Sequence, residues 1–425
     1  MGFSKFALET AAKLKPVLIK IVPESMLSSM KEKLVQHSTS KLKNVHIEPY
    51  NRTIYEDGIN LIGNIRGDTG LGQSTRLVAE ILENSGENYT IHNFFVPPGT
   101  SMNDHSCDDK ITEDLPYNIN LIHVNASEFT VAFLKMGKEV WDHRYNIAYW
   151  LWELEDFPQE WVGCIDLVDE IWTPADFITN TLKKLTDKPV YTVPYCVKAP
   201  VSPEFDRTFF GLPENQFLFL MMFDSGSIME RKNPLGTIEA FKRAFGRDKK
   251  DVGLVLKINE NEQKDIDYIH SLLDGYDNIY IISETLTKVQ VNSLTKCVDV
   301  FVSLHRAEGF GLVLAEAMIV GTPTIATNWS ANTEFMSKDA ACMVDYRMVE
   351  LQQDLPPFKK GYKWADADID QASGYMKRLY EDKAFYEKIA LNAKLYVADK
   401  LNMKRSVGIV RERINDIRNG ASKEL

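Results

Sequence analysis

The chain has 425 residues, which is long enough for two ordinary domains. Its content of 44% hydrophobic and 26% charged residues is typical of a folded globular protein and excludes a disordered one. The net charge of −11 disfavours nucleic acid as the main partner, because such binding depends on a basic surface that neutralises phosphates.

The five cysteines are scattered singly, without a C-x-x-C pair that would indicate a zinc site or a redox dithiol. This pattern predicts a reducing, cytoplasmic location. The sequence contains no run of 18 apolar residues, so it predicts no membrane-spanning helix. Lysines within the apolar N-terminal stretch argue against a cleaved signal peptide.

Residues 1–50 are expected to form a lysine-rich amphipathic arm. Residues 1–45 carry eight lysines and three glutamates, a net charge of +5. Apolar residues and lysines recur at rough helical spacing, and Pro16 and Pro23 divide the stretch. Two interpretations remain open: a peripheral anchor on the anionic inner face of a cell membrane, or an arm that packs on the protein or on a second subunit.

Residues 51–198 alternate between strand and helix patterns. A strand is expected at 58–65, a glycine loop at 67–74 and a helix at 75–86. Further strands are expected at 89–95, 119–126, 145–152, 169–174 and 189–195. Strands that alternate with helices predict a mostly parallel sheet covered on both faces.

A second α/β series occupies residues 199–398, and the boundary between the two series is expected within 196–212. Strands are expected at 217–223, 252–258, 278–284, 300–305 and 322–328, and helices at 233–246, 288–298 and 312–321. Residues 399–425 are expected to form a terminal helix. In both domains, ligands should bind beyond the carboxyl ends of the parallel strands.

The segment EGFGLVLAEAM, residues 308–318, places two carboxylates around a glycine-spaced turn. A helix expected from about Leu312 would expose free backbone N–H groups that suit a phosphate. Glu308 and Glu316 would lie about 12 Å apart along a continuous helix, which fits two ends of a nucleotide sugar better than one shared proton. Taken alone, each carboxylate is better explained as a helix charge, but Glu316 lies among apolar residues, where a buried acid needs a partner.

The longer segment EGFGLVLAEAMIVGTPTIAT resembles the E-x7-E segment of retaining glycosyltransferase family 4. The resemblance covers most of residues 58–400 and is strongest over 217–335. It implies an α/β GT-B fold, in which two Rossmann-like, doubly wound parallel-sheet domains face each other across a cleft. In such a fold the first domain is expected to bind the acceptor and the second to bind the nucleotide-sugar donor.

The resemblance also implies a role for each residue of the motif. Glu308 is expected to contact hydroxyls of the donor sugar, and Glu316 is expected to hold the ribose. The backbone of the intervening turn and of the first helical residue would contact sugar and phosphate, which adds Gly309, Phe310, Gly311 and Leu312 to the donor site.

Family members usually place an arginine and a lysine six residues apart after the first strand of the second domain, where they neutralise the diphosphate. Lys232 fills the lysine position, but the arginine position falls near Gly226. Arg231 is expected to replace that arginine, and the alternative for both residues is a solvated charge pair. Lys257, at the end of a strand, is a weaker candidate for the same role.

In the first domain, GDTGLGQSTR follows a strand and opens a helix, which makes a turn that suits an anion. The family resemblance implies that this loop, with Gly70 and Gly72, approaches the donor phosphates and the acceptor. Thr75 stands where the third glycine of a dinucleotide fingerprint belongs, so a nicotinamide cofactor is disfavoured. The family often has a catalytic histidine at the end of a later strand. Asn125 falls on that position and His123 precedes it by two residues, so the role stays open between the two. A lone histidine on a strand more often serves packing than chemistry.

The segment YWLWELEDF is similar to one in a bacterial subgroup of the family. Trp150, Trp152 and Glu153 are predicted to bind an acceptor sugar, because aromatic faces and a carboxylate suit such a ligand. For Trp161 and Trp172 core packing is preferred. The acidic run DADID, residues 366–370, is expected to cap the following helix and to bind no metal.

The sequence therefore predicts a retaining, metal-independent hexosyltransferase without a cofactor. It would move a mannose- or glucose-type sugar from a nucleoside diphosphate donor to a glycan or glycolipid in polysaccharide biosynthesis, and the subgroup resemblance favours mannose from a guanine donor. A non-catalytic GT-B protein that binds a glycan or stabilises a partner remains an alternative, because the expected arginine is missing. An epimerase or phosphorylase on the same fold is a further rival.

Overall fold

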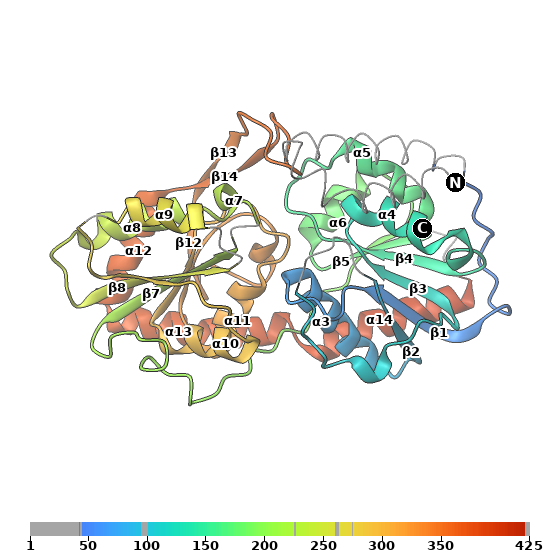
Figure 1. Cartoon of the computed structure of the whole chain (residues 1–425), viewed down its shortest axis with the longest axis horizontal. Coiled ribbons are helices and arrows are strands. Elements are labelled where there is room, and N and C mark those ends of the chain that lie inside the picture. Colours follow the sequence, from blue (N-terminus) through green and yellow to red (C-terminus); the bar gives the residue numbers. More distant parts are fainter. Residues whose placement is uncertain are drawn as a thin grey trace. The chain divides into compact units, whose positions relative to one another are not determined.

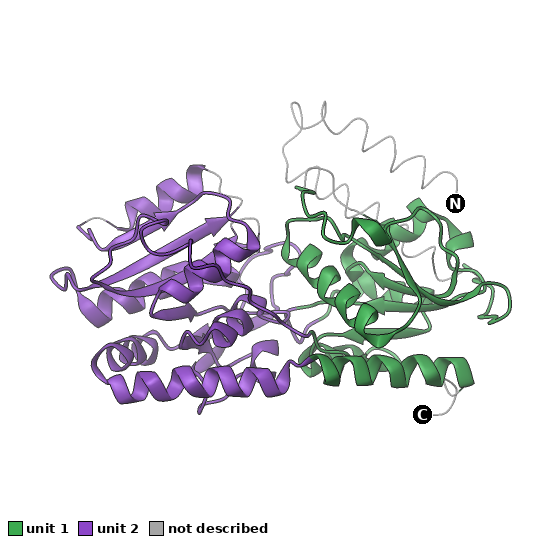
Figure 2. Cartoon of the chain, turned by 90° about the horizontal axis from the view of Figure 1, so that it is seen from below, with its two compact units in different colours: residues 1–152, 157–195, 403–425 green, residues 153–156, 196–402 purple. Residues whose placement is uncertain are grey.

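The structure is a computed structural model that describes residue 42 and residues 45–94, 101–224, 227–259, 263–273 and 275–420. The chain divides into two compact units (Figure 2): unit 1 contains residues 1–152, 157–195 and 403–425, and unit 2 contains residues 153–156 and 196–402. The lysine-rich arm predicted for residues 1–50 lies almost wholly outside the described residues, so both interpretations of it remain predictions.

Unit 1 is built on a six-stranded parallel sheet with the strand order β2-β1-β3-β4-β5-β6. Helices α4, α5 and α6 lie on one face of this sheet, and α3 and α14 lie on the other (Figure 1). The strands are β1 (Glu56–Gly63), β2 (Tyr89–Asn93), β3 (Tyr117–His123), β4 (Tyr145–Tyr149), β5 (Glu170–Thr173) and β6 (Val190–Thr192). The helices are α3 (Gly70–Ser85), α4 (Ala126–Met136), α5 (Gln159–Val162), α6 (Asp176–Lys183) and α14 (Met403–Asn419).

A ladder of buried asparagines crosses the middle of this sheet. Asn60, Asn120 and Asn146 occupy paired positions on β1, β3 and β4. Asn60 donates to Asn120 at 2.9 Å, and Asn120 donates to Asn146 at 2.9 Å. The amides thus satisfy one another in a setting where an unpaired polar group would be costly, and they fix the register of the three strands.

The C-terminal helix α14 is fastened to unit 1 by a buried ion pair. Arg413 donates to Glu170 Oε1 at 3.1 Å and to Oε2 at 2.7 Å. Glu170 also accepts hydrogen bonds from Tyr145 at 3.0 Å and from Trp172 at 2.6 Å. Both carboxylate oxygens are therefore fully engaged inside the unit.

Unit 2 is built on a second six-stranded parallel sheet with the order β12-β11-β10-β7-β8-β9. Helices α8, α9 and α12 lie on one face, and α10, α11 and α13 lie on the other (Figure 1). The strands are β7 (Phe217–Asp224), β8 (Val252–Asn259), β9 (Ile279–Ile282), β10 (Val300–Ser303), β11 (Thr324–Thr327) and β12 (Cys342–Val344). The helices are α7 (Met229–Lys232), α8 (Pro234–Phe245), α9 (Gln263–Ser271), α10 (Lys288–Cys297), α11 (Leu312–Val320), α12 (Ile369–Glu381) and α13 (Lys383–Lys400).

An antiparallel hairpin projects from unit 2 and was not foreseen in the sequence. It consists of β13 (Tyr346–Glu350) and β14 (Lys363–Ala367), which pair with each other and not with the parallel sheet (Figure 1). The hairpin is inserted between β12 and α12. The acidic run 366–370 spans the end of β14 and the start of α12, where Asp368 caps the helix by accepting from the Gln371 N–H at 3.0 Å, as predicted.

Both sheets confirm the predicted doubly wound α/β class, while some boundaries differ. Helix α3 begins at Gly70, inside the predicted glycine loop, because the Thr69 hydroxyl caps it by accepting from the Gly72 N–H at 3.2 Å. Among the described residues, no helix is both long and apolar enough to cross a membrane.

Candidate functional site

The predicted donor residues of unit 2 gather where the strand order reverses. The chain adds β8 and β9 on one side of β7, and it adds β10, β11 and β12 on the other. In open parallel sheets, ligands bind at the carboxyl ends of the strands beside such a reversal. The loop after β7 leads to α7, which carries Arg231 and Lys232, and the loop after β10 carries Glu308.

Arg231, Lys232 and Glu308 form what we call the charged cluster. The Lys232 ammonium donates to Glu308 Oε1, and the Arg231 guanidinium lies 3.8 Å from Oε2. Arg231 is fixed by donating to the Ala307 carbonyl at 3.0 Å. Among the described residues, Glu308 Oε2 therefore receives no hydrogen bond, which leaves it able to accept one from a ligand.

The electrostatics of the charged cluster favour an anionic ligand. Burial would raise the pKa of Glu308, but Lys232 and Arg231 lower it to about 2. Burial lowers the pKa of Lys232, and the Glu308 carboxylate opposes that shift. Two cations thus lie beside the Glu308 carboxylate, and such a pair of cations suits a phosphate group.

Helix α11 begins beside the charged cluster, in agreement with the predicted start at Leu312. Its N-cap, Gly311, has φ 91°, in the left-handed region that favours glycine, and it provides no side-chain cap. The Gly311 carbonyl already accepts from the N–H groups of Leu314 and Ala315. The first N–H groups of the helix, at Leu312 and Val313, have no intrahelical acceptor and are available to a ligand.

Glu316 is buried in the second turn of α11, with 3% of its surface exposed. Its Oε1 pairs with Lys288 at the start of α10, whereas its Oε2 has no hydrogen-bond partner among the described residues. Burial raises the pKa of Glu316, and Lys288 opposes that shift. A buried carboxylate oxygen without a donor is costly, so this atom is suited to a hydroxyl of a bound ligand.

Glu153 lies beside the charged cluster. It belongs to the short segment 153–156, which groups with unit 2. Burial raises its pKa, and its carboxyl group interacts electrostatically with Arg231, Glu308 and Lys232. Glu153 is thus a fourth titratable group near the charged cluster. The sequence predicts that it binds the acceptor sugar.

Lys257 ends β8, next to β7, and is completely buried. Burial lowers its pKa to about 8. Its ammonium donates to the Ile258 carbonyl at 3.2 Å and to Asn259 Oδ1. Lys257 therefore stabilises the end of its own strand, and its hydrogen-bond partners among the described residues lie outside the charged cluster.

A second set of predicted residues gathers at the strand-order reversal of unit 1, between β1 and β3. Gly70 and Gly72 lie in the first turn of α3, which follows β1. A side chain at position 72 would meet the Gly67 carbonyl oxygen at 2.0 Å, so only glycine permits this close approach. Gly72 thus shapes the turn, whereas a side chain at Gly70 would meet open space. A role of both glycines in phosphate binding remains a prediction.

His123 and Asn125 have partners inside unit 1. His123 is fully buried, and its ring nitrogens lie 2.7 Å from the Ser74 hydroxyl and 3.3 Å from the Thr75 hydroxyl. Burial lowers its pKa to about 4, so its imidazole is neutral at pH 7. Asn125 accepts from the Leu151 N–H at 3.0 Å. These contacts hold His123 inside unit 1, and a part for His123 or Asn125 in catalysis remains a prediction.

Trp150 and Trp152 are also packed inside unit 1. They are 0% and 3% exposed, and their rings contact Phe129, Phe157 and Trp161 at centroid distances of 5.1 to 6.4 Å. Core packing, which the sequence favours for Trp161 and Trp172, therefore also explains Trp150 and Trp152. The structure corrects the prediction that they offer open faces to an acceptor sugar.

Several residues of unit 2 that support the site carry no local signal in the sequence. Ser330 accepts from the Glu308 N–H at 3.1 Å, and His305 contacts Asn332 Oδ1 at 3.1 Å, so the segment after β11 holds the loop after β10. Lys288 was likewise missed, because it is 28 positions from Glu316. Among the described residues, no group of three or more His, Cys, Asp or Glu side chains is arranged to hold a metal ion.

Comparison with known proteins fits this geometry. Residues 203–396, most of unit 2 and all of the charged cluster, match the family described as glycosyl transferases group 1. A search of curated proteins found no match to the chain.

Solved structures resemble the whole fold at low sequence identity. HepE of Anabaena, solved with UDP and glucose, is 12% identical and aligns over 85% of this chain and 100% of its own, with a TM-score of 0.61. A glycosyltransferase of Rickettsia africae is 13% identical over 85% of this chain and 99% of its own, with a TM-score of 0.62. Sucrose-phosphate synthase of Thermosynechococcus elongatus is 12% identical over 85% and 100%, also with a TM-score of 0.62. The fold of this chain is therefore GT-B.

Proposed function

We propose that the protein is a retaining glycosyltransferase that moves a hexose from a nucleoside diphosphate sugar to a hydroxyl of a glycan or glycolipid. The observation that carries this proposal is the arrangement of the charged cluster at the start of α11, with the half-satisfied Glu316 one turn further along. Cations, open N–H groups and two carboxylate oxygens without donors match a diphosphate with a sugar at each end.

In this proposal each part of the donor has its own contacts. The diphosphate lies at the N-terminus of α11, against Lys232 and Arg231. The transferred hexose donates hydroxyl hydrogen bonds to Glu308 Oε2, while the ribose donates to Glu316 Oε2. The backbone of Gly309, Phe310 and Gly311 borders the sugar.

The reaction follows from this charge distribution. The bond between the anomeric carbon and the β-phosphate oxygen breaks, and the acceptor oxygen bonds to the same carbon on the same face. The acceptor proton passes to the departing phosphate oxygen, so no protein nucleophile is needed. Lys232 and Arg231 stabilise the charge that develops on the diphosphate, and the protein otherwise contributes positioning.

The donor base, the hexose and the setting are further parts of the proposal. A guanine donor with mannose was favoured by sequence resemblance, whereas the similar fold of HepE was solved with UDP and glucose. Both bases therefore belong in the first screen. The acceptor is proposed to belong to polysaccharide or glycolipid synthesis at the cytoplasmic face of a membrane, with no metal or cofactor taking part.

The proposal is tested by thermal shift with UDP, GDP and dTDP, because a ligand that binds only the folded state raises its stability. One nucleotide should stabilise the wild type and the Lys377→Ala control, whose lysine is exposed on α12, but not the Lys232→Ala variant. Release of that nucleotide from its sugar conjugate in the presence of acceptor then tests transfer. The proposal fails if no nucleotide stabilises the wild type or if Lys232→Ala responds like the control.

A further inference from the structure

A pocket of about 350 Å³ lies in unit 2 along the β13–β14 hairpin, mostly at the end that leads into the connecting loop, and the proposed donor site does not use it. Its lining includes Glu230, the residue before Arg231, and Arg306, which precedes Glu308 by two positions. Ligand pockets in proteins measure roughly 300 to 1,000 Å³. This pocket therefore has room for one small ligand or one unit of a larger one.

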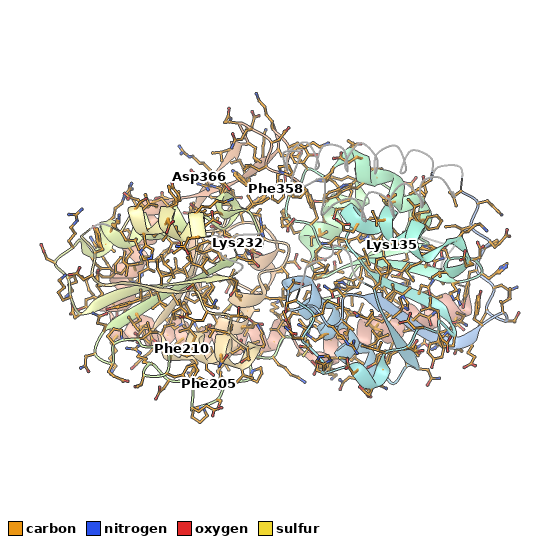
Figure 3. All side chains as sticks on the ribbon, in the orientation of Figure 1. Lys135, Phe205, Phe210, Lys232, Phe358 and Asp366 are labelled. Carbon is orange, nitrogen blue, oxygen red and sulfur yellow. The ribbon has the colours of Figure 1, made fainter. Side chains whose placement is uncertain are left out.

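One wall of the pocket is held rigidly. Arg306 donates to Asp366 Oδ1 from Nε at 3.1 Å and from Nη2 at 2.9 Å, and to the Glu230 carbonyl at 2.6 Å. Its guanidinium also lies over the Trp364 ring, 5.7 Å from the centroid. Phe358 packs on the same ring, and Figure 3 labels Phe358 and Asp366 on this hairpin. The hairpin is thus joined to the loops that carry the charged cluster.

The lining combines apolar surface with hydrogen-bond acceptors. Val349, Leu351, Leu355 and Trp364 provide the apolar part. Glu230, Glu350 and Asp366 also line the pocket together with Arg306, and Asp366 is paired with both Arg306 and Arg347. Glu230 and Glu350 make no ion pair among the described residues, and their negative charge disfavours an anionic ligand. A neutral pyranose fits, because it offers apolar C–H faces and several hydroxyl donors.

The pocket is also directly connected to the donor site. The Arg306 N–H donates to the Arg231 carbonyl at 2.7 Å, so the residues that line the pocket and those that form the charged cluster alternate along the same two loops. A sugar in this pocket would be close to the proposed site of transfer.

We propose that the hairpin pocket binds a neutral hexopyranose unit of the acceptor glycan. The assignment of this unit to the acceptor rests on the proposed transferase function, whereas its capture by the pocket does not. The hairpin then serves as an acceptor-recognition element of unit 2. It would select against acceptors that carry a negative charge on that unit.

The test uses saturation-transfer difference NMR on the full chain, with the methyl α-glycosides of glucose, mannose and galactose as neutral probes. Glucuronic acid serves as the anionic probe and tri-lysine as the cationic peptide probe. Val349→Phe fills the pocket, while Met348→Phe places the same side chain on the opposite, exposed face of β13, because adjacent strand residues alternate in direction. Nucleotide binding to each variant is measured in parallel by thermal shift.

We expect saturation transfer from the wild type and Met348→Phe to at least one neutral glycoside, its loss in Val349→Phe, and no transfer to glucuronic acid. The proposal is overturned if no neutral glycoside binds, if both variants behave alike, if glucuronic acid binds as well as the neutral probes, or if only tri-lysine binds. Failure of nucleotide binding alone would remove the proposed transferase function and leave sugar capture by the pocket intact.

Discussion

Each unit contains a buried pair of a glutamate and a cation, and the two pairs differ in how completely the carboxylate is satisfied. In unit 1, Glu170 accepts four hydrogen bonds, two of them from Arg413. In unit 2, the Glu308 side chain accepts one hydrogen bond among the described residues, from Lys232. The first pair joins a helix to a sheet, and the second retains the capacity to bind a ligand. Burial of charge therefore does not by itself indicate function, and what distinguishes Glu308 is its place beside two cations and the start of α11.

The largest effect should come from breaking the pair in unit 1. Arg413→Ala leaves a buried carboxylate without its cation, which should lower the free energy of unfolding by about 3 to 5 kcal/mol. Urea denaturation measures this loss, and Glu412→Ala, on the exposed face of the same helix, should change little. A loss from Arg413→Ala no larger than that of the control would show that the saturated pair does not stabilise unit 1.

Lys232→Ala should reduce turnover strongly and stability only slightly, in contrast to Arg413→Ala. We expect turnover to fall by about 10²- to 10³-fold, as when one group that stabilises transition-state charge is removed. The loss of stability should be smaller than in Arg413→Ala, because the Lys232 side chain is 17% exposed and water can reach Glu308. Kinetics of sugar transfer and urea denaturation on the same preparation separate the two effects. Unchanged turnover would remove Lys232 from the mechanism.

Glu316→Gln tests the carboxylate oxygen that has no partner. Loss of a hydrogen bond to a charged group costs about 1.5 to 3 kcal/mol, so nucleotide affinity should fall by about tenfold or more. A 2′,3′-dideoxynucleoside diphosphate should bind wild type and variant equally, because it lacks the ribose hydroxyls. Glu381→Gln, an exposed change on α12, is the control for titration calorimetry. If the variant weakens both nucleotides equally, Glu316 does not hold the ribose.

The two units should also lose stability over different pH ranges. The pKa of His123 in unit 1 is lowered to about 4, so the unfolded chain binds its proton first and stability falls as the pH drops from about 6.5 to about 4. The pKa of Glu308 in unit 2 is lowered to about 2, so its contribution is present above about 4.5 and is lost as the pH falls towards 2.

Unfolding free energies measured across pH 2 to 8 would check both ranges. His123→Asn should reduce the pH dependence of the unfolding free energy only between about pH 6.5 and 4. Glu308→Gln should reduce it only between about pH 4.5 and 2. If both variants changed the unfolding free energy equally in the same pH range, the two residues would not act over different pH ranges.

The sequence was sufficient for those features that depend on short segments. Continuous apolar runs predicted the buried strands of both sheets, such as Phe217–Asp224, and the glycine turn predicted the start of α11 at Leu312. The exposed β13 strand was missed, because Tyr346–Glu350 has only one residue that is not exposed and so lacks the pattern of a buried strand.

Contacts between distant segments could not be predicted from spacing. The partner of Glu316 is Lys288 on another helix, and Glu153 comes from a segment that groups with unit 2 although its sequence neighbours belong to unit 1. The aromatic residues Trp150 and Trp152 were assigned by type to sugar binding, but their type suits a core equally well. Burial, which only the fold determines, decided between the two.

The most direct test of the central claim is a crystal structure of the protein with the nucleoside diphosphate that stabilises it most. We predict that the β-phosphate lies within hydrogen-bonding distance of the Leu312 N–H and the Lys232 ammonium, and that a ribose hydroxyl donates to Glu316 Oε2. A diphosphate bound away from α11, with Glu316 Oε2 still unpaired, would contradict the account.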